Sequence, residues 1–403
     1  RFEKFARSEK WSYKSPNAAG PAVALLEHGE FISGDEKKRL FNASDVLCFP
    51  SYYRAEATPT VILDALSHGL PVISTAWRGI PELLPEKGIE PCEIRSPSQV
   101  AERLLASLDV CNWSDYREQY ISKFSLPVFL DKTAAALAEA CEETASTRAK
   151  QARIVIFAHT PPPVHGQSLM VQSMLEGISK LSSSVGPGAF PLRVFHVDAR
   201  LSSGIDDVGV GSPLKFIRLL RYCAEAIWHR VAHRADILYY IPAPAKATPI
   251  LRDCVAMALL RPVFPKRIYQ HRAMGLGLWM KSPGRTVFER AGQAATSRLL
   301  GEPNLSMVLT PAGVSDAEPF RPRRIVVVPN GKADPCPDYN EAILPARVRR
   351  FESRTAAFGK TEHRRENRDR NGPSYDMLFL GLCKRSKGLF DALETVEACR
   401  QEL

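Results

Sequence analysis

The sequence of 403 residues has no long apolar run, no paired cysteines and no D-x-D triplet, and each absence excludes a class of protein or site. No apolar run approaches the ~18–20 residues of a spanning helix, so no such helix is predicted. The nine cysteines are spread singly, without a C-x-x-C pair, which argues against a zinc site and a disulfide framework. Residues 1–10 alternate charged and polar side chains, so no signal peptide is predicted.

Charge is the unusual feature of an otherwise ordinary composition, with 45% apolar and 24% charged residues. Much of the net charge of +10 comes from residues 347–370, where nine Lys or Arg residues face four acids. This stretch has few apolar residues and is predicted to be a solvated, flexible connector. Only Phe351 and Phe358 could stack on bases there, so no nucleic-acid partner is expected, and anionic lipid head groups are the better electrostatic match.

Short apolar segments alternate with helical patterns, which predicts an α/β fold with parallel sheets. In the first part we expect strands at 24–31, 45–50 and 71–75, with helices at 35–42, 60–68 and 132–143. In the second part we expect strands at 154–158, 193–197, 237–241, 267–270, 306–310 and 325–328, and a helix at 168–179. A last strand at 377–381 and a helix at 388–401 follow the basic stretch.

Residues 212–234 are predicted to form a long amphipathic helix, with Ser212 as N-cap and Pro213 at the first position. Its apolar residues recur at three- and four-residue spacing: Leu214, Ile217, Leu220, Ala224, Ile227 and Val231. We predict that this apolar face packs on a sheet and leaves a solvated basic face. A membrane-docking face is the alternative.

The stretch 51–83 carries the clearest chemical pattern. The strand 45–50 should deliver its loop to the carboxyl edge of a parallel sheet, where such sheets bind ligands. The backbone of residues 58–61 opens a helix, which is a natural phosphate seat. Glu56 precedes this helix and Asp64 lies one turn inside it, so two acids can straddle the ligand. A second turn, at Gly79, could approach the same ligand closely.

These segments resemble the donor-binding motif of the retaining family 4 (group 1) glycosyltransferases: EATPTVILD at 56–64, GLP at 69–71 and RGIPE at 78–82. Residues 152–167 resemble the family's first strand and acceptor-side glycine loop. Residues 326–331 resemble its passage between domains, and residues 379–388 resemble the opening of its donor domain. The resemblance covers nearly the whole chain and implies the GT-B fold, with two Rossmann-like parallel-sheet domains.

The resemblance also implies site residues. Glu56, beside the transferred sugar, and His271, as the acceptor-side histidine, are the catalytic candidates, with Gln270, Arg272 and His165 open as alternatives to His271. Donor-binding candidates are Asp64 at the ribose, Lys387 at the diphosphate, and Thr58, Pro59, Thr60, Gly79 and Gly166 around it. The resemblance implies no bound metal, in agreement with the lack of a D-x-D triplet. It implies no cofactor, because the nucleotide sugar is a substrate.

Two residues depart from the family pattern. Asp64 is one methylene shorter than the usual glutamate, which puts its reach to the ribose in question. Leu382 stands where an arginine is common, and Lys384 or Arg385 could substitute for that charge.

The segments come in an unusual order. The latter part of a donor-binding domain (1–147) precedes the acceptor-side domain (148–335), a basic linker (336–375) and the first βα unit of a donor-binding domain (376–403). The donor domain is therefore split between the two chain ends, and we predict that strand 377–381 pairs in parallel with strand 45–50. A window cut from tandem enzymes, a circular permutation and a truncated piece of a rearranged gene all stay open, and the missing start methionine favours the last.

We therefore expect a hexosyltransferase-type enzyme that moves a sugar from a nucleotide-sugar donor to a saccharide or lipid-linked acceptor. Cell-surface polysaccharide or glycolipid synthesis in the cytoplasm is the expected setting, by analogy, with peripheral contact at the inner face of the cell membrane left open. A nucleotide-sugar epimerase of the same fold and a non-catalytic sugar-nucleotide-binding module are the alternatives.

Overall fold

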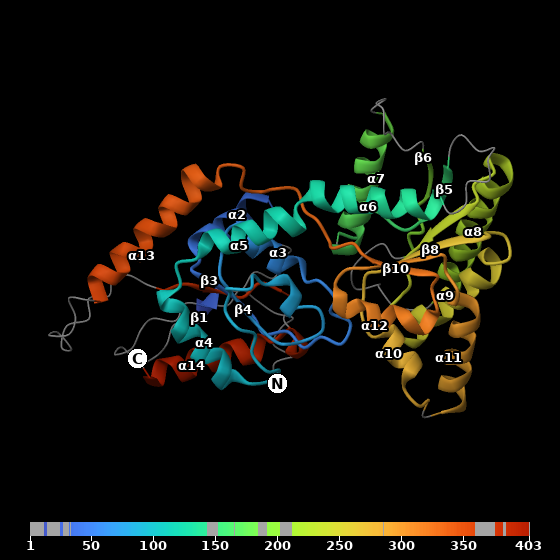
Figure 1. The fold of residues 1–403 in the computed structure, drawn as a ribbon. Helices are drawn as coiled ribbons and strands as arrows, with labels where there is room; N and C mark the ends of the chain where they lie inside the picture. The colour runs from blue at the N-terminus through green and yellow to red at the C-terminus, as the bar shows by residue number, and fades with distance from the viewer. Residues whose placement is uncertain are drawn as a thin grey trace. The chain divides into compact units, whose positions relative to one another are not determined.

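The computed structural model describes residues 12–13, 25–26, 32, 34–142, 152–164, 166–183, 192–201, 212–284, 286–358, 375–381 and 384–402. Contacts divide the chain into two units (Figure 1). The first contains Arg1–Tyr53, Val61–Ser122 and Asp334–Leu403, and the second contains Arg54–Thr60 and Lys123–Ala333. Each unit has a parallel sheet with helices, which confirms the predicted α/β class with two parallel-sheet units.

The second unit is built on a six-stranded parallel sheet in the order β10-β9-β8-β7-β5-β6. Its strands are β5 (Ala152–Phe157), β6 (Leu192–Val197), β7 (Ile237–Tyr240), β8 (Lys266–His271), β9 (Leu305–Val308) and β10 (Arg324–Val327). Each strand lies within two residues of its predicted range. The strand order reverses between β5 and β7, and ligands of such sheets bind at the carboxyl ends near the reversal.

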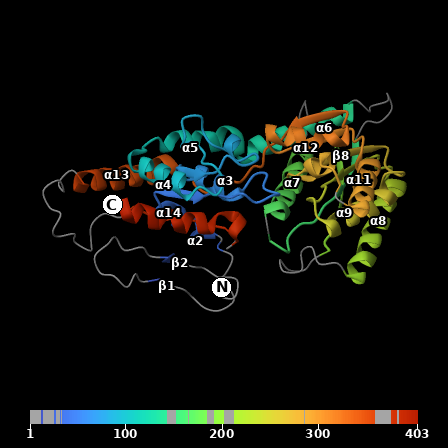
Figure 2. The same cartoon turned by 90° about the horizontal axis from the view of Figure 1, so that it is seen from below.

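Helices cover both faces of this sheet (Figure 2). Neighbouring residues of a strand point to opposite faces, so each strand contributes side chains to two cores. Ile154 and Ile156 of β5 share a core with α6 (Leu126–Glu142) and α7 (Gly166–Ser183). Val155 and Phe157 share the opposite core with α8 (Pro213–His233) and α9 (Ala247–Leu260). The remaining elements are α10 (Leu276–Lys281), α11 (Val287–Leu300), η4 (Pro311–Gly313), α12 (Val314–Ala317) and η5 (Glu318–Phe320).

The contacts of α6 place the boundary between the two units earlier in the chain than the predicted 147/148. Phe129 and Leu137 of α6 pack in the same core as Ile154, so the helix belongs to the second unit, and the division falls at 122/123. A sequence pattern shows that this helix has an apolar face, but not which sheet the face covers.

Helix α8 begins as predicted but packs through a different face. The Ser212 hydroxyl accepts the N–H of Lys215, and Pro213 is the first helical residue. The buried side chains are Leu219, Cys223 and Ala226. The prediction that the stripe containing Ile217 and Val231 packs on the sheet is wrong, because those two side chains are 62% and 72% exposed.

The first unit contains a three-stranded parallel sheet in the order β11-β3-β4. Its strands are β3 (Val46–Phe49), β4 (Val72–Ser74) and β11 (Met377–Leu378), with Met377 opposite Val46 and Leu378 opposite Leu47. The predicted parallel pairing of strands from the two chain ends is therefore confirmed. The strands β1 (Ser12–Tyr13) and β2 (Leu25–Leu26) pair antiparallel with each other, in a separate sheet.

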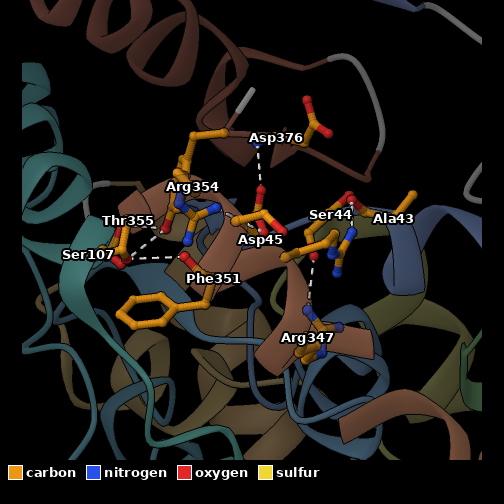
Figure 3. Close-up of polar contacts among 12 residues, drawn as sticks. Ala43, Ser44, Asp45, Ser107, Arg347, Phe351, Arg354, Thr355 and Asp376 are labelled. Carbon is orange, nitrogen blue, oxygen red and sulfur yellow. Dashed lines mark hydrogen bonds and ion pairs between the residues drawn. The ribbon is translucent and has the colours of Figure 1, made fainter. Parts of the chain in front are cut away.

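Polar contacts extend this pairing beyond the strands (Figure 3). The N–H of Asp45 donates to the carbonyl of Asp376 at 2.8 Å, and the N–H of Asp376 donates to the Asp45 carboxylate at 2.9 Å. The helices of this unit are α2 (Gly34–Ala43), α3 (Thr60–Ser67), α4 (Pro97–Ala106), α5 (Trp113–Gln119), α13 (Leu344–Phe358) and α14 (Leu389–Glu402). The single turns are η1 (Pro81–Leu83), η2 (Ser107–Asp109), η3 (Tyr120–Phe124), η6 (Tyr339–Ile343) and η7 (Arg385–Lys387).

The prediction of a flexible connector over 336–375 is wrong for Leu344–Phe358, which form α13. Residues 359–374 lie outside the described residues. The Arg347 side chain is 3% exposed and donates to three backbone carbonyls, those of Phe41, Ser44 and His68, at 2.8–3.1 Å. A helix leaves its last carbonyls without partners, so the cation stabilises the ends of α2 and α3.

Two more arginines of α13 contact the region where α2 ends and β3 begins. Arg350 donates to the carbonyls of Asn42 and Ala43. Arg354 forms an ion pair with Asp45 at 3.2 Å (Figure 3). Arg347 and Arg350 together therefore bind the carbonyls of residues 41–44, at the end of α2. Sequence reasoning assigned these charges to a solvated surface, whereas the structure uses them to hold α13 in the first unit.

Replacing Arg347 with alanine should destabilise the first unit by about 2–4 kcal/mol, because three buried carbonyls lose a charged donor. Arg349→Ala, at an exposed position of the same helix, is the matched control and should cost less than about 0.5 kcal/mol. Urea unfolding followed by circular dichroism measures both. Equal effects of the two substitutions would contradict the anchoring role of Arg347.

Candidate functional site

Residues 50–59 connect β3 to α3, and the stretch 54–60, which ends at the first residue of α3, contains the candidates Glu56, Thr58, Pro59 and Thr60. Their contacts place them in the second unit. The N–H of Met274 lies 3.4 Å from the carbonyl oxygen of Ala55, and Ala57 packs with Met274 and Leu309. The side chains of Glu56 and Thr58 are 7% and 8% exposed. The segment is therefore a packed loop.

Thr58 has a buried hydroxyl oxygen with no hydrogen-bond partner among the described residues. Leaving a buried hydroxyl unpaired costs ~1–3 kcal/mol. Thr58 stands two residues before the start of α3, where the first N–H groups also lack partners within the helix. A bound anion at this helix start would satisfy both kinds of donor.

Asp64 lies within α3 and is buried, and its carboxylate forms an ion pair with Lys37 of α2. Sequence reasoning missed Lys37. Nothing in its local pattern, in the run Lys37–Lys38–Arg39, distinguishes the one lysine that meets Asp64. The partner is decided by how α2 packs beside α3.

Lys387 lies at the carboxyl end of β3. Its ammonium is 4.7 Å from the ring centroid of Tyr53 and 5.6 Å from that of Phe49. The backbone fixes this position, because the N–H of Tyr52 donates to the carbonyl of Ser386 at 2.9 Å. Aromatic faces attract a cation, so the two rings hold the ammonium at this end of the strand.

Gly388 makes this close approach possible. Its φ is 83°, and a Cβ there would come within 2.2 Å of the carbonyl oxygen of Pro50. Only glycine fits both the left-handed backbone and the contact with the end of β3.

The two predicted glycines have different surroundings. In the turn after β4, the left-handed φ of 55° belongs to Arg78, and Gly79 is buried. Gly166 is the exposed first residue of α7, and a Cβ added there would lie 3.4 Å from Cγ2 of Thr60, within the same unit. Leu382 and His165 lie outside the described residues.

His271 ends β8 and is buried, with its Nε2 3.3 Å from the hydroxyl oxygen of Ser306. Burial lowers the pKa of His271 to about 4, so the imidazole is neutral near pH 7. Together with Ala57, Met274 and Asp316, it lines a small cavity of about 10 Å³. This volume suits about one water and is too small for a sugar. Ala57, the residue that follows Glu56, and His271 line the same cavity.

The neighbours of His271, both alternatives for the acceptor-side position, are held differently. The Tyr239 hydroxyl donates to the Gln270 side-chain oxygen. Arg272 donates to the Asn330 side chain at 2.8 Å, and burial lowers the pKa of Arg272. Residues 270–272 all lie at the carboxyl end of β8. Gln270 and Arg272 therefore stay alternatives to His271 for the acceptor-side position.

Asp316 is a site residue that the sequence did not indicate. It is buried, lines the cavity, and accepts the N–H groups of Gly275 and Leu278 at 3.0 and 3.1 Å. It therefore caps the start of α10. Over the described ranges, no group of three or more His, Cys, Asp or Glu side chains could hold a metal ion.

Residues 17–109 match the family model described as glycosyl transferases, group 1. The match spans less than a quarter of the chain and includes β3, the loop with Glu56, α3 and the turn at Gly79. No curated protein and no solved structure matches the chain. The matched segment supports a glycosyltransferase, and it is the segment that holds most of the candidate donor-binding residues.

The stability of the protein should fall with falling pH because of His271. An unfolded imidazole has a pKa near 6.5. The folded one stays neutral down to about pH 4, so between these values the unfolded state binds more protons. This linkage should remove about 2 kcal/mol of stability between pH 7 and pH 5. Urea unfolding at both pH values should show a smaller loss for His271→Gln, and an identical loss would contradict the buried neutral state.

Thr58→Val should raise the stability of the free protein by about 1 kcal/mol and weaken nucleoside diphosphate binding about three- to tenfold. The reason is that valine removes an unpaired buried hydroxyl that a ligand would use. Thr133→Val is the matched control, since its buried hydroxyl also lacks a partner among the described residues but lies on α6. Thermal melting and calorimetry should show stabilisation in both variants and weaker binding only in Thr58→Val. Unchanged nucleotide affinity in Thr58→Val would refute the ligand contact.

Proposed function

We propose that this protein is a retaining glycosyltransferase of the hexosyltransferase type, which moves a sugar from a nucleotide-sugar donor to an acceptor hydroxyl. The observation that carries the proposal is the position of Lys387 against Phe49 and Tyr53, at the end of the strand that leads into the Glu56–Asp64 segment. The group 1 glycosyltransferase match over residues 17–109 supports the same reaction class.

The donor diphosphate would be held by cationic and neutral donors together. Lys387 supplies a charge, and the start of α3 supplies N–H groups and the Thr58 hydroxyl. As the sugar departs, the diphosphate gains negative charge, and donors fixed in advance stabilise that change. Asp64 would contact the ribose, and Gly79 and Gly166 would allow the backbone to approach the phosphates. We propose that no metal and no cofactor is required.

Glu56 and His271 would act at the sugar. A buried carboxylate at Glu56 stabilises positive charge on the sugar ring as the bond to the leaving group lengthens. His271 is neutral at working pH, so it would hydrogen-bond a substrate hydroxyl instead of pairing with a charge. The expected acceptor is a saccharide or a lipid-linked saccharide, in cytoplasmic assembly of a cell-surface polysaccharide or glycolipid.

The test is an assay with a panel of nucleotide sugars, with and without lipid-linked and free saccharide acceptors. Acceptor-dependent release of nucleoside diphosphate, with retained anomeric configuration in the product, is expected. Sugar conversion without an acceptor would identify an epimerase instead. Donor binding without any turnover across the panel would identify a non-catalytic binding module.

Two substitutions should separate turnover from donor binding. Glu56→Gln should lower kcat about 100-fold with little change in donor affinity, because the carboxylate charge matters most in the transition state. Lys387→Ala should weaken nucleoside diphosphate binding about ten- to 100-fold by removing a charge-assisted contact. Lys87→Ala, at an exposed position of the same unit, is the matched control. Calorimetry with Lys387→Ala binding as tightly as the parent would refute the diphosphate role.

A further inference from the structure

The outer face of α8 is apolar, although the helix already buries another face in the second unit. Leu219, Cys223 and Ala226 are the buried residues. On the other side of the helix, Leu214, Ile217, Trp228 and Val231 are 56%, 62%, 57% and 72% exposed. Helix α8 therefore has two apolar stripes, of which the structure covers one.

The exposed stripe is continuous along the helix. Positions 214, 217, 221, 224, 228 and 231 alternate three- and four-residue steps, so they stand in one row. Only Arg221 in that row is polar, and Phe216 and Leu220 widen it on one side, at 50% and 40% exposure. Exposed apolar side chains that are gathered in one row, and not scattered singly, mark a contact site.

Positive charge borders the row. Lys215, Arg218 and Arg221 belong to the first half of α8, and Arg234 follows its end. Arg230 is engaged in an ion pair with Asp236 at 2.7 Å. Glu225 is the one acid within the helix sequence. In Figures 1 and 2, α8 lies along the outside of the second unit's sheet, which leaves this face accessible within the unit.

We propose that the outer face of α8 docks the protein on an anionic lipid bilayer, with the apolar row in the interface and the basic side chains at the head groups. Exposed apolar side chains bordered by Lys and Arg are the composition that binds such surfaces. Trp228 fits the boundary between head groups and acyl chains. In the part of the chain that the structure describes, no helix is long and apolar enough to cross a bilayer, so α8 lies on the surface.

Charge distinguishes this partner from a second copy of the chain. Two copies joined through the same row would bring Arg218 and Arg221 of one copy toward like charges of the other, with only Glu225 on the helix to compensate. An anionic bilayer instead gains attraction from every one of these cations. The docking surface is separate from the donor segment, and its test needs no glycosyl transfer.

The experiment is sedimentation of the purified full chain with vesicles of phosphatidylcholine alone, or with about one third phosphatidylglycerol. Binding to the anionic vesicles is expected, with at least a tenfold lower partition to neutral ones and a loss at about 0.5 M salt. Substituting Ile217→Ser with Trp228→Ser, or Arg218→Gln with Arg221→Gln, should each reduce the partition at least tenfold. These positions are exposed, so unchanged melting temperatures should accompany the loss.

Phe288→Ser on α11 is the matched control, because Phe288 is 89% exposed but lies outside the α8 row. It should leave vesicle binding unchanged. Equal binding to both vesicle types, or loss of binding with Phe288→Ser but not with the α8 pairs, would overturn the proposal. Analytical ultracentrifugation showing a dimer that Ile217→Ser with Trp228→Ser dissociates would assign the row to a second copy instead.

Discussion

Strand β3 has hydrogen-bonding groups on both edges and buried side chains on both faces, and the first unit depends on satisfying them together. Its four residues are all buried, so an unpaired N–H or carbonyl there would cost ~1–3 kcal/mol. One edge pairs with β4, and the other pairs with β11 from the far end of the chain. This pairing brings α14 against α4 and delivers Lys387 to the carboxyl end of β3. The structural requirement of one strand thus also assembles the candidate diphosphate site.

The arginines of α13 act on the same unit by a different interaction. Backbone carbonyls at the ends of α2 and α3 carry partial negative charge, and Arg347 and Arg350 supply donors to them. Arg354 pairs with Asp45, and Asp45 accepts the N–H of Asp376 directly before β11. The arginine contacts and the strand pairing therefore meet at one residue. The ion pair that anchors α13 and the hydrogen bond beside β11 thus share the Asp45 carboxylate.

The candidate residues of the two units differ in electrical character. The Lys387 ammonium lies over aromatic rings, the Thr58 hydroxyl lacks a partner among described residues, and His271 is held neutral by burial. A diphosphate suits the first two groups, whereas a sugar hydroxyl suits the third. The same burial that costs stability at Thr58 and His271 keeps their hydrogen-bonding capacity available to a ligand.

The amino-acid sequence alone predicts the alternation of strands and helices and the cap of α8 by Ser212, and the family resemblance adds the pairing of strand 377–381 with strand 45–50. The first two features follow from local periodicity and capping residues, which can be read along the chain. The pairing follows from the strand order that the resemblance implies for a donor domain. Only the tertiary structure decided that Lys37 meets Asp64, that Arg347 serves three carbonyls, and that α8 buries Cys223 while Ile217 faces outward. A helix with two apolar stripes, or a run of several basic residues, has more than one acceptable orientation. The choice between orientations rests on packing against segments distant in sequence, which no local pattern encodes.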